Sequence, residues 1–334
     1  MTTTLPISLL CFNINDFGNN FDKALKRLPD QEHKEILRYK FEKDRRLALA
    51  SRLLRRYYYA TELNIPWETI QFSIQPGGKP TLALHQKQGQ WMDFNISHDG
   101  DWVIFGATEK NNMSIGVDVV SLKNETYGTI SDFIYSFHDQ LTYEERKLLE
   151  NIKQEDNKLI AFFQIWGLKE SYIKAHGKGL SIPLNGFYID NDNGDDDSGN
   201  AEEEEEGEKE EKEENNNSNK NDTNNITTTK KMQHFTSREQ LTKRSVNTTT
   251  SKSKKTRLKL HRGNQSYESY WCVHLSYLDT NSVSVICCGD INEQQPIDND
   301  LVLFAHQSLQ LGDFSQQTTS VFKRLQLNQL CSFS

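Results

Sequence analysis

Residues 190–262 form a stretch of strongly biased composition that cannot belong to a packed hydrophobic core. Residues 190–214 contain 15 Asp or Glu against 2 Lys, and residues 215–262 contain 12 Lys or Arg against 2 acids, among many Asn, Thr and Ser. A segment with so few apolar side chains cannot offset the conformational entropy that it would lose on folding. We therefore predict a disordered insertion over residues 190–262, which interrupts the fold between two segments that are themselves typical of strands.

The charged stretch raises the question whether the protein binds nucleic acid or acts as an interaction protein. Nucleic-acid-binding proteins combine basic residues with aromatic platforms or a recognition fold, and neither accompanies the basic residues here. We predict no nucleic-acid partner. A non-catalytic protein that works through its insertion stays open as an alternative. Deleting residues 190–262 would inactivate such a protein, whereas an enzyme would largely survive the deletion.

Outside the insertion, the hydrophobic pattern alternates between strands and helices. Thr142 followed by Glu145 forms a capping box, which marks the start of one helix. Apolar runs and alternating segments predict strands, whereas apolar residues at spacings of three and four predict helices. The strands are expected at residues 7–14, 70–74, 102–108, 113–120, 270–279 and 283–288, and the helices from about residue 31, over about 44–62, from 142 and over about 156–176.

A short internal repeat suggests that the ordered part consists of two halves. One long helix is followed by Leu-Asn-Ile-Pro at residues 63–66 and the other by Leu-Ser-Ile-Pro at residues 180–183. A match of three residues in four can also arise by chance. If the repeat is genuine, it predicts two similar α/β halves, with the cleft between them as the natural ligand site. The expected parts are an N-terminal subdomain (1–110), a C-terminal subdomain (111–189 plus 263–290), the insertion, and an unassigned C-terminal tail (291–334).

The N-terminal residues and the cysteines favour a cytoplasmic protein. Residues 1–17 lack a basic segment and contain only a short apolar run, so no signal peptide is predicted. No segment approaches the roughly 20 apolar residues of a membrane span, so no membrane partner is expected. The five cysteines form no C-x-x-C pair, which favours buried thiols over a zinc site or a disulfide framework.

Two carboxylates and a lysine form the strongest candidate for a reactive site. Asp118 interrupts the apolar run Ile-Gly-Val-Asp-Val-Val, where a charge is costly unless it is paired or bound to a cation. Glu170 and Lys174 are neighbours at i,i+4 on a largely apolar helix face. Asp118 and Glu170 together would supply the oxygen ligands that Mg²⁺ prefers, with Lys174 facing phosphate oxygens. The alternatives are an Asp that caps a loop and an ordinary surface ion pair.

Two loops and one helix start have features of phosphate-binding sites. Residues 77–80, Gly-Gly-Lys-Pro, follow a predicted strand, and their glycines would let backbone amides approach an anion. Residues 95–98, Asn-Ile-Ser-His, end another strand and offer an amide, a hydroxyl and an imidazole. Each signal is weak alone, because such turns are common and a lone histidine is more often structural. The helix over 44–62 begins near the basic residues Lys43, Arg45 and Arg46 and continues through Arg52, Arg55 and Arg56.

Taken in order, these motifs resemble those of one enzyme family. The strings GGKP, FNISHDGDW, IGVDVV and WGLKESYIKAHGKGLSIPL are similar to the motifs of phosphopantetheinyl transferases of the large, two-subdomain type. LNIPWETI and FNISH are nearest to the eukaryotic branch that activates aminoadipate-semialdehyde dehydrogenase or reductase. The resemblance covers residues 7–183 and, more loosely, residues 270–288. It implies an α+β fold, a pseudo-twofold pair of similar α/β subdomains with the active site in the cleft between them, where coenzyme A (CoA) binds.

The resemblance also implies roles for individual residues. Asp118 and Glu170 correspond to the metal ligands, and Glu170 and Lys174 to the catalytic residues, with Glu170 or a water that it orients as the base. Arg45 or Arg46 is an alternative to Lys43 for the nucleotide phosphate. Val120 stands where bacterial members often carry a further carboxylate, so water would complete the metal shell. The residues implied to contact CoA are Lys43, Gly78, Lys79, Pro80, Asn95, Ser97 and His98.

The implied reaction transfers the 4'-phosphopantetheine arm of CoA to a serine of an apo acyl or peptidyl carrier domain. The reaction would depend on Mg²⁺ and release adenosine 3',5'-bisphosphate. The branch resemblance favours the carrier domain of the aminoadipate reductase of lysine biosynthesis as the partner. A monomer is expected, because one chain supplies both halves of the cleft. The alternative is a CoA-binding regulatory module without transferase activity, although such a module would have little reason to keep Asp118, Glu170 and Lys174 together.

Overall fold

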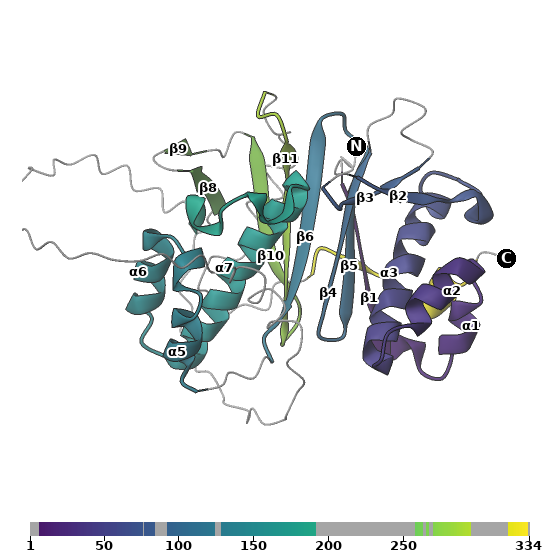
Figure 1. Ribbon diagram of the computed structural model, residues 1–334, viewed down its shortest axis with the longest axis horizontal. Helices are drawn as coiled ribbons and strands as arrows, with labels where there is room; N and C mark the ends of the chain where they lie inside the picture. Colours follow the sequence, from purple (N-terminus) through teal and green to yellow (C-terminus); the bar gives the residue numbers. More distant parts are fainter. Residues whose placement is uncertain are drawn as a thin grey trace, which may run out of the picture.

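A computed structural model of the protein describes residues 7–75, 77–83, 92–123, 128–191, 258–262, 265–266, 270–294 and 320–332. Strands form a central layer, with helices α1 to α3 on one side and α5 to α7 on the other (Figure 1). The mixed helix and sheet content confirms the predicted α+β class. Among the described residues, no helix combines the length and the apolar character that crossing a bilayer requires.

The first half, which is the part built on the sheet of β1, β4 and β5, takes most of its elements from residues 7–108. The two long strands β4 and β5 follow the long helix α3, and all three surround one core. The elements are β1 (Ile7–Asn13), α1 (Phe21–Leu25), α2 (Asp30–Leu37), α3 (Glu42–Thr61), β2 (Phe72–Ile74), β3 (Pro80–Leu82), β4 (Asp93–Asp99) and β5 (Trp102–Thr108).

The second half is built around the long helix α7. Its sheet combines one strand before residue 190 with two strands near the C-terminal end. The elements of this half are β6 (Met113–Ser121), α5 (Ile130–Tyr135), α6 (Tyr143–Asn151), α7 (Glu155–His176), β7 (Tyr188–Asn191), β8 (Leu258–Arg262), β9 (Gln265–Ser266), β10 (Trp271–Asp279) and β11 (Ser282–Asp290). Strand β12 (Lys323–Arg324) and helix α10 (Leu327–Leu330) follow nearer the C-terminus and pack with the first half. The predicted capping box of Thr142 and Glu145 is present at the start of α6.

Two main sheets carry the fold, and each has its own helix. The strand order is β12-β1-β5-β4 in one sheet and β10-β11-β6 in the other. Helix α3 packs on β1, β4 and β5, whereas α7 packs on β6 and β11. A third hydrophobic cluster lies between the sheets and joins residues of β1 and β5 to residues of β6, β10 and β11. The two sheets therefore share a core, and the halves meet where β4 lies beside β6.

Gly116 lets helix α7 lie directly on strand β6. A Cβ atom at this position would lie 1.9 Å from the backbone oxygen of Ser171 and 2.4 Å from the backbone nitrogen of Ala175. Real Cβ atoms do not approach other atoms so closely, so a side chain here would have to displace the helix. Glycine at position 116 therefore sets the distance between the strand that carries Asp118 and the helix that carries Glu170 and Lys174.

The end of the charged stretch differs from the predicted boundary. Residues 258–262 form β8, which pairs antiparallel with β7, so that Asn191 lies opposite Leu258. Leu260 is fully buried in the core of the second half. Because Leu258–Arg262 alternates polar and apolar residues, it satisfies a strand pattern that its basic composition concealed. The rest of the predicted insertion, residues 192–257, lies outside the described residues.

The pairing of β7 with β8 leads to a test of what the fold requires. We expect that replacing residues 192–257 with an Asn-Gly turn leaves the thermal unfolding midpoint within about 4 °C of the full-length value. Asn191 and Leu258 are direct antiparallel partners, and a two-residue turn suffices to join such partners. Thermal denaturation followed by circular dichroism would measure the midpoint.

A larger deletion provides the control. Removing residues 190–262 eliminates β8 and the buried Leu260, and loss of such a side chain alone typically costs about 2–5 kcal/mol. The midpoint of this variant should fall well below that of the shorter deletion. Equal midpoints would contradict the assignment of β8 to the core.

The described part of the C-terminal tail returns to the first half. Strand β12 pairs parallel with β1, and the Leu325 amide donates a hydrogen bond to the Cys11 carbonyl at 2.9 Å. Leu325 and Leu330 are fully buried in the core that α3 covers. Arg324 forms an ion pair with Asp16 at 2.9 Å. The tail, which the sequence left unassigned, thus completes the sheet and the core of the first half.

Candidate functional site

Asp118 lies in the middle of strand β6, on the face that α7 covers. Its side chain is 8% exposed. Residues of β6 alternate between two environments, because successive side chains of a strand point to opposite faces. Val117 and Val119 enter the core between the sheets, whereas Asp118 faces the helix near Gly167, where a Cβ atom would lie 3.7 Å from Asp118 Oδ2. The apolar run thus presents one carboxylate to α7.

Lys174 and Ser97 surround one oxygen of this carboxylate. The Lys174 ammonium, from α7, donates to Asp118 Oδ1 at 2.5 Å and to Ser97 Oγ at 3.0 Å. The Ser97 hydroxyl, from β4, in turn donates to Asp118 Oδ1 at 2.8 Å. Three residues that the sequence singled out therefore meet at the junction of the two halves, with Ser97 as the contribution of the first half.

Glu170 lies one helical turn before Lys174 and is half-buried. Burial raises the pKa of the Glu170 carboxyl, and repulsion from Asp118 raises it further, while Lys174 lowers it. Two carboxylates that repel each other in this way are stabilised by a cation between them. The carboxylate oxygens, with water and substrate phosphates, fit the preference of Mg²⁺ for one or two protein carboxylates. No group of three or more His, Cys, Asp or Glu able to hold a metal occurs among the described residues.

His98 follows Ser97 in the sequence but points to the other face of β4. On that face Phe94 and Ile96 pack into the core under α3. The side chain of His98 is accessible to solvent. Protein atoms nevertheless hinder its hydration, and this desolvation, followed by repulsion from Lys174, lowers the pKa of His98, while Asp44 and Asp118 oppose the change. The ring is therefore neutral at pH 7, and a bound phosphate would favour its protonation.

The start of α3 lies beside the turn between β4 and β5. Lys43 Nζ is 3.4 Å from Asp101 Oδ1 in that turn, and its side chain is half-exposed. Arg45 donates to the Tyr39 carbonyl at 2.7 Å, and Arg46 donates to Glu42 and to the Gly18 carbonyl. Of these three basic residues, Lys43 has the most accessible side chain, whereas local hydrogen bonds hold the guanidinium groups of Arg45 and Arg46.

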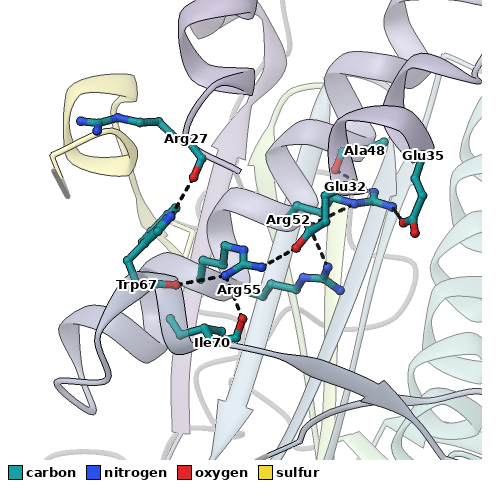
Figure 2. A network of polar contacts seen from close by, with 9 residues as sticks. Arg27, Glu32, Glu35, Ala48, Arg52, Arg55, Trp67 and Ile70 are labelled. Carbon is teal, nitrogen blue, oxygen red and sulfur yellow. Dashed lines mark hydrogen bonds and ion pairs between the residues drawn. The ribbon is translucent and has the colours of Figure 1, made fainter. Parts of the chain in front are cut away.

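The other arginines of α3 belong to a network away from Asp118. Figure 2 shows Glu32 of α2 between Arg52 and Arg55, whose guanidinium nitrogens lie 3.3 and 3.2 Å from it. Arg56 also pairs with Glu32 and donates to the carbonyls of Trp67 and Ile70. These guanidinium groups hold α2, α3 and the segment before β2 together. Because these contacts engage the three arginines within the protein, we assign Arg52, Arg55 and Arg56 a structural role and not a role in binding phosphate.

Lys79 is buried and is not brought to the Asp118 group. Its ammonium donates to Asp93 Oδ2 at 2.5 Å, to the Ile115 carbonyl at 3.0 Å and to the Ala175 carbonyl at 3.3 Å. Burial lowers the pKa of Lys79, although the charge of Asp93 opposes this change. All three N–H groups of the ammonium have protein partners. The contacts give Lys79 a structural role in this state, and its predicted contact with CoA remains a prediction.

The turn that precedes Lys79 packs on the C-terminal end of α7. A Cβ atom on Gly77 would lie 2.0 Å from the Gly177 carbonyl oxygen. Gly78 adopts a left-handed conformation with φ of 85° and has open space around it, and Pro80 begins β3. The exposed Gly78 and the half-buried Pro80 therefore remain at the surface, where a ligand can reach them.

Asn95 is buried and faces β6 rather than solvent. Its side-chain oxygen accepts a hydrogen bond from the Val117 amide at 3.0 Å. Asp99, which sequence reasoning did not single out, accepts from the Ser121 amide at 2.7 Å. Burial raises the pKa of Asp99, and the charge of Asp118 adds to this effect. The signal was present in the sequence, because residues 93, 95, 97 and 99 alternate as polar side chains along one strand.

Lys169 is a second residue whose importance the sequence did not reveal. It precedes Glu170 but points into the core, where it is 1% exposed. Its ammonium lies 2.8 Å from Glu145 Oε2 and donates to the carbonyls of Leu184 and Phe187 at 2.6 and 2.7 Å. Glu145 also completes the capping box of α6, because its side chain accepts a hydrogen bond from the Thr142 amide. This buried pair fixes the rotation of α7 about its axis, and thereby the direction in which Glu170 points.

The arrangement has the chemical features of a site for a phosphorylated ligand and a divalent cation. Asp118 and Glu170 provide negative charge for the cation. Lys174 provides an ammonium, while His98 and Lys43 lie on the other half at the same junction. Such groups bind and polarise phosphate oxygens, which is the main requirement for phosphoryl transfer.

Comparisons with known proteins identify relatives over most of the described chain. A model for the N-terminal part of 4'-phosphopantetheinyl transferases matches residues 15–110, and the 4'-phosphopantetheinyl transferase superfamily model matches residues 114–229. The chain is 32% identical over 168 residues to the human L-aminoadipate-semialdehyde dehydrogenase-phosphopantetheinyl transferase. The matched region covers 50% of this chain and 54% of the human protein. It is 33% identical over 172 residues to a 4'-phosphopantetheinyl transferase of Aneurinibacillus migulanus, covering 52% of this chain and 65% of the relative. The matches thus span about half to two thirds of these relatives.

Proposed function

Because the chain belongs to the 4'-phosphopantetheinyl transferase superfamily, we propose that it transfers the 4'-phosphopantetheine arm of CoA to a serine of an apo carrier domain. The observation that carries this proposal is the meeting of Asp118 and Lys174 with Ser97, beside Glu170, where the two halves join. These groups come from three separate motifs and lie together only in the folded chain.

In the proposed reaction, the hydroxyl oxygen of the carrier serine attacks the β-phosphorus of CoA. A new P–O bond forms to the serine, and the bond between the β-phosphorus and the bridging pyrophosphate oxygen breaks. The electron pair of that bond leaves with adenosine 3',5'-bisphosphate. The serine proton passes to Glu170 or to a water that Glu170 orients.

The remaining residues position the phosphates. Lys174 is held by Asp118 and Ser97 in the free protein, and in the complex its ammonium balances the charge on the leaving phosphate. His98 and Lys43 bind the phosphates of the nucleotide from the side of α3. Gly78 and Pro80 lie at the surface of the turn before β3 and contact the nucleotide. Asp118 and Glu170 would hold Mg²⁺, which neutralises pyrophosphate charge when bound.

We further propose the two-part architecture that this reaction requires. Each long helix, α3 or α7, is followed by Leu-x-Ile-Pro, a short 3-10 turn and a strand. Each also packs on the sheet of its own half. These parallels support a pseudo-twofold relation with CoA bound in a cleft between the halves. A single chain would supply both halves, so the enzyme acts as a monomer.

The partner is proposed from the names of the relatives. The human protein and a protein of Schizosaccharomyces pombe, 32% identical over 165 residues (47% of this chain, 62% of that protein), are both named for L-aminoadipate-semialdehyde dehydrogenase. We infer that this chain serves the carrier domain of an aminoadipate reductase in lysine biosynthesis.

Intact-mass spectrometry tests the proposal directly. An apo carrier domain of an aminoadipate reductase is incubated with the protein, CoA and Mg²⁺, beside a sample that contains a chelator. We expect the carrier to gain one phosphopantetheine arm in the first sample and none in the second. If CoA binds but no carrier of several types gains the arm, the protein is a CoA-binding regulatory module instead.

A further inference from the structure

Strand β6 lies at the edge of its sheet, and side chains accept hydrogen bonds from the backbone amides that have no strand partner. One side of β6 pairs with β11, and the other side faces β4. Four amides on that side donate to side-chain oxygens of β4. The four hydrogen bonds are Ile115 N to Asp93 Oδ2 (2.8 Å), Val117 N to Asn95 Oδ1 (3.0 Å), Val119 N to Ser97 Oγ (3.4 Å) and Ser121 N to Asp99 Oδ2 (2.7 Å). We call Asp93, Asn95, Ser97 and Asp99 the polar ladder.

The ladder fixes how far one half can slide along the other. Its residues are two apart on β4, as are their partners on β6, because both strands repeat every two residues. Each amide that lost its acceptor would be buried without a partner, which proteins avoid. A shift of one residue along the strands would move each acceptor away from its amide and would break all four bonds at once. Only one register of the two halves is therefore favourable.

The ladder is also bonded to the candidate site. Ser97 donates to Asp118 and accepts from Lys174, so one rung is itself part of the site. At the other end, Asp93 binds Lys79, which reaches the Ala175 carbonyl near the end of α7. The ladder thus contacts both the strand and the helix that carry the carboxylates. On its opposite face, the same strand carries His98.

We propose that the polar ladder is the device that positions the two halves of the site, and that Asn95 is a positioning residue rather than a ligand of CoA. The inference rests on the proposed function, because it assigns the two halves to one reaction. Asn95 holds β4 in register, so that His98 stays at a fixed distance from Asp118, Glu170 and Lys174. Only Asn95 and Ser97 among the ladder residues are uncharged, and Ser97 hydrogen-bonds to Asp118, so Asn95 can be replaced without removing a charge or a contact with Asp118.

Two substitutions of Asn95 separate positioning from mere stability. Asn95→Leu keeps the size of the side chain but removes the acceptor, whereas Asn95→Asp keeps an acceptor oxygen. We expect Asn95→Leu to lower kcat/KM per folded molecule by about 10- to 100-fold, since small misplacements of reacting groups have effects of this size. Asn95→Asp should recover most of the loss. If Asn95→Leu does not fold, Asn95→Ser, whose shorter side chain weakens the bond, should show a smaller loss in the same direction.

Ser284→Ala is the matched control. Ser284 is fully buried on β11, and its hydroxyl lies 3.0 Å from that of Ser276, so the substitution also removes a buried hydrogen bond but leaves the ladder intact. The folded control should have the kcat/KM of the unaltered protein. Equal kcat/KM values for Asn95→Leu and Ser284→Ala, or an unaltered value for Asn95→Ser, would overturn the positioning role.

A second measurement tests the polar ladder independently of the proposed transferase activity. Hydrogen exchange of the Val117 amide should become at least about 10-fold faster in Asn95→Leu than in Ser284→Ala, since the amide loses its acceptor. If the unaltered protein transfers nothing to any carrier, the proposed function fails, and the ladder is then tested by this exchange and by CoA affinity. Unchanged exchange at Val117 would overturn the ladder even in an active enzyme.

Discussion

Replacement of Glu170 by glutamine is expected to lower the rate of phosphopantetheine transfer by about 10²–10³-fold without loss of the folded state. Glutamine has nearly the same shape but no charge, so it can neither hold a cation strongly nor accept the serine proton. Removal of a single group that stabilises or deprotonates the reacting atoms typically costs this much. Transfer measured by intact-mass spectrometry over a range of Mg²⁺ concentrations would give the rate and the metal requirement.

The same Glu170→Gln substitution should not lower the thermal unfolding midpoint. Burial and the charge of Asp118 raise the pKa of Glu170, which means that its ionised form is unfavourable in the folded protein. The neutral glutamine should therefore leave the thermal midpoint unchanged or raise it. Glu150→Gln, at an exposed position of α6, is the matched control and should change neither rate nor midpoint. A Glu170→Gln protein as active as this control would exclude Glu170 from the reaction.

A methyl group at position 116 is expected to reduce the free energy of unfolding by about 3 kcal/mol or more. Overfilling a packed core commonly costs about 1–3 kcal/mol, and the upper end applies where the neighbours cannot move. In this protein the neighbours of the new Cβ are the backbone atoms of Ser171 and Ala175, at 1.9 and 2.4 Å. Urea denaturation of Gly116→Ala would measure the loss.

Gly167→Ala offers a graded comparison at the same interface. Its Cβ would lie 3.0 Å from a methyl group of Val285 and 3.2 Å from one of Val120, and such side-chain ends can shift by a few tenths of an ångström. We expect a clearly smaller loss than for Gly116→Ala. A loss as large as that of Gly116→Ala, or no loss at position 116, would contradict the direct contact of helix and strand backbones.

The secondary structure was predicted well where the hydrophobic pattern was strong. The strand expected at residues 102–108 is β5 with the same bounds, and the helix expected at about 156–176 is α7, Glu155–His176. Residues 258–262 were assigned to the insertion because basic residues dominate their neighbourhood. A strand of five residues with one fully buried leucine gives too short a signal to outweigh such composition.

The candidate site was only partly predictable from the sequence. Asp118, Glu170 and Lys174 could be chosen because charged residues interrupt apolar runs. The interruption of an apolar run does not predict the direction in which a side chain points. The motif predicts that Ser97 and His98 act together, yet they lie on opposite faces of β4. Lys79 and Asn95 bind other parts of the protein. Partners of this kind come from distant segments, so that no local pattern encodes them.

The return of β12 and α10 to the first half has a consequence for the order of folding. The sheet that begins at Ile7 receives its edge strand from residues 323–324, and Leu325 and Leu330 fill its core. During synthesis, these residues leave the ribosome after the second half has been made. Until then the sheet of the first half lacks the strand that pairs with β1, and its core lacks two leucines. The sheet of the second half is complete once β11 has been synthesised. Contacts between such distant segments slow folding, so the pairing of β1 with β12 adds a late step to the folding of the half that is synthesised first.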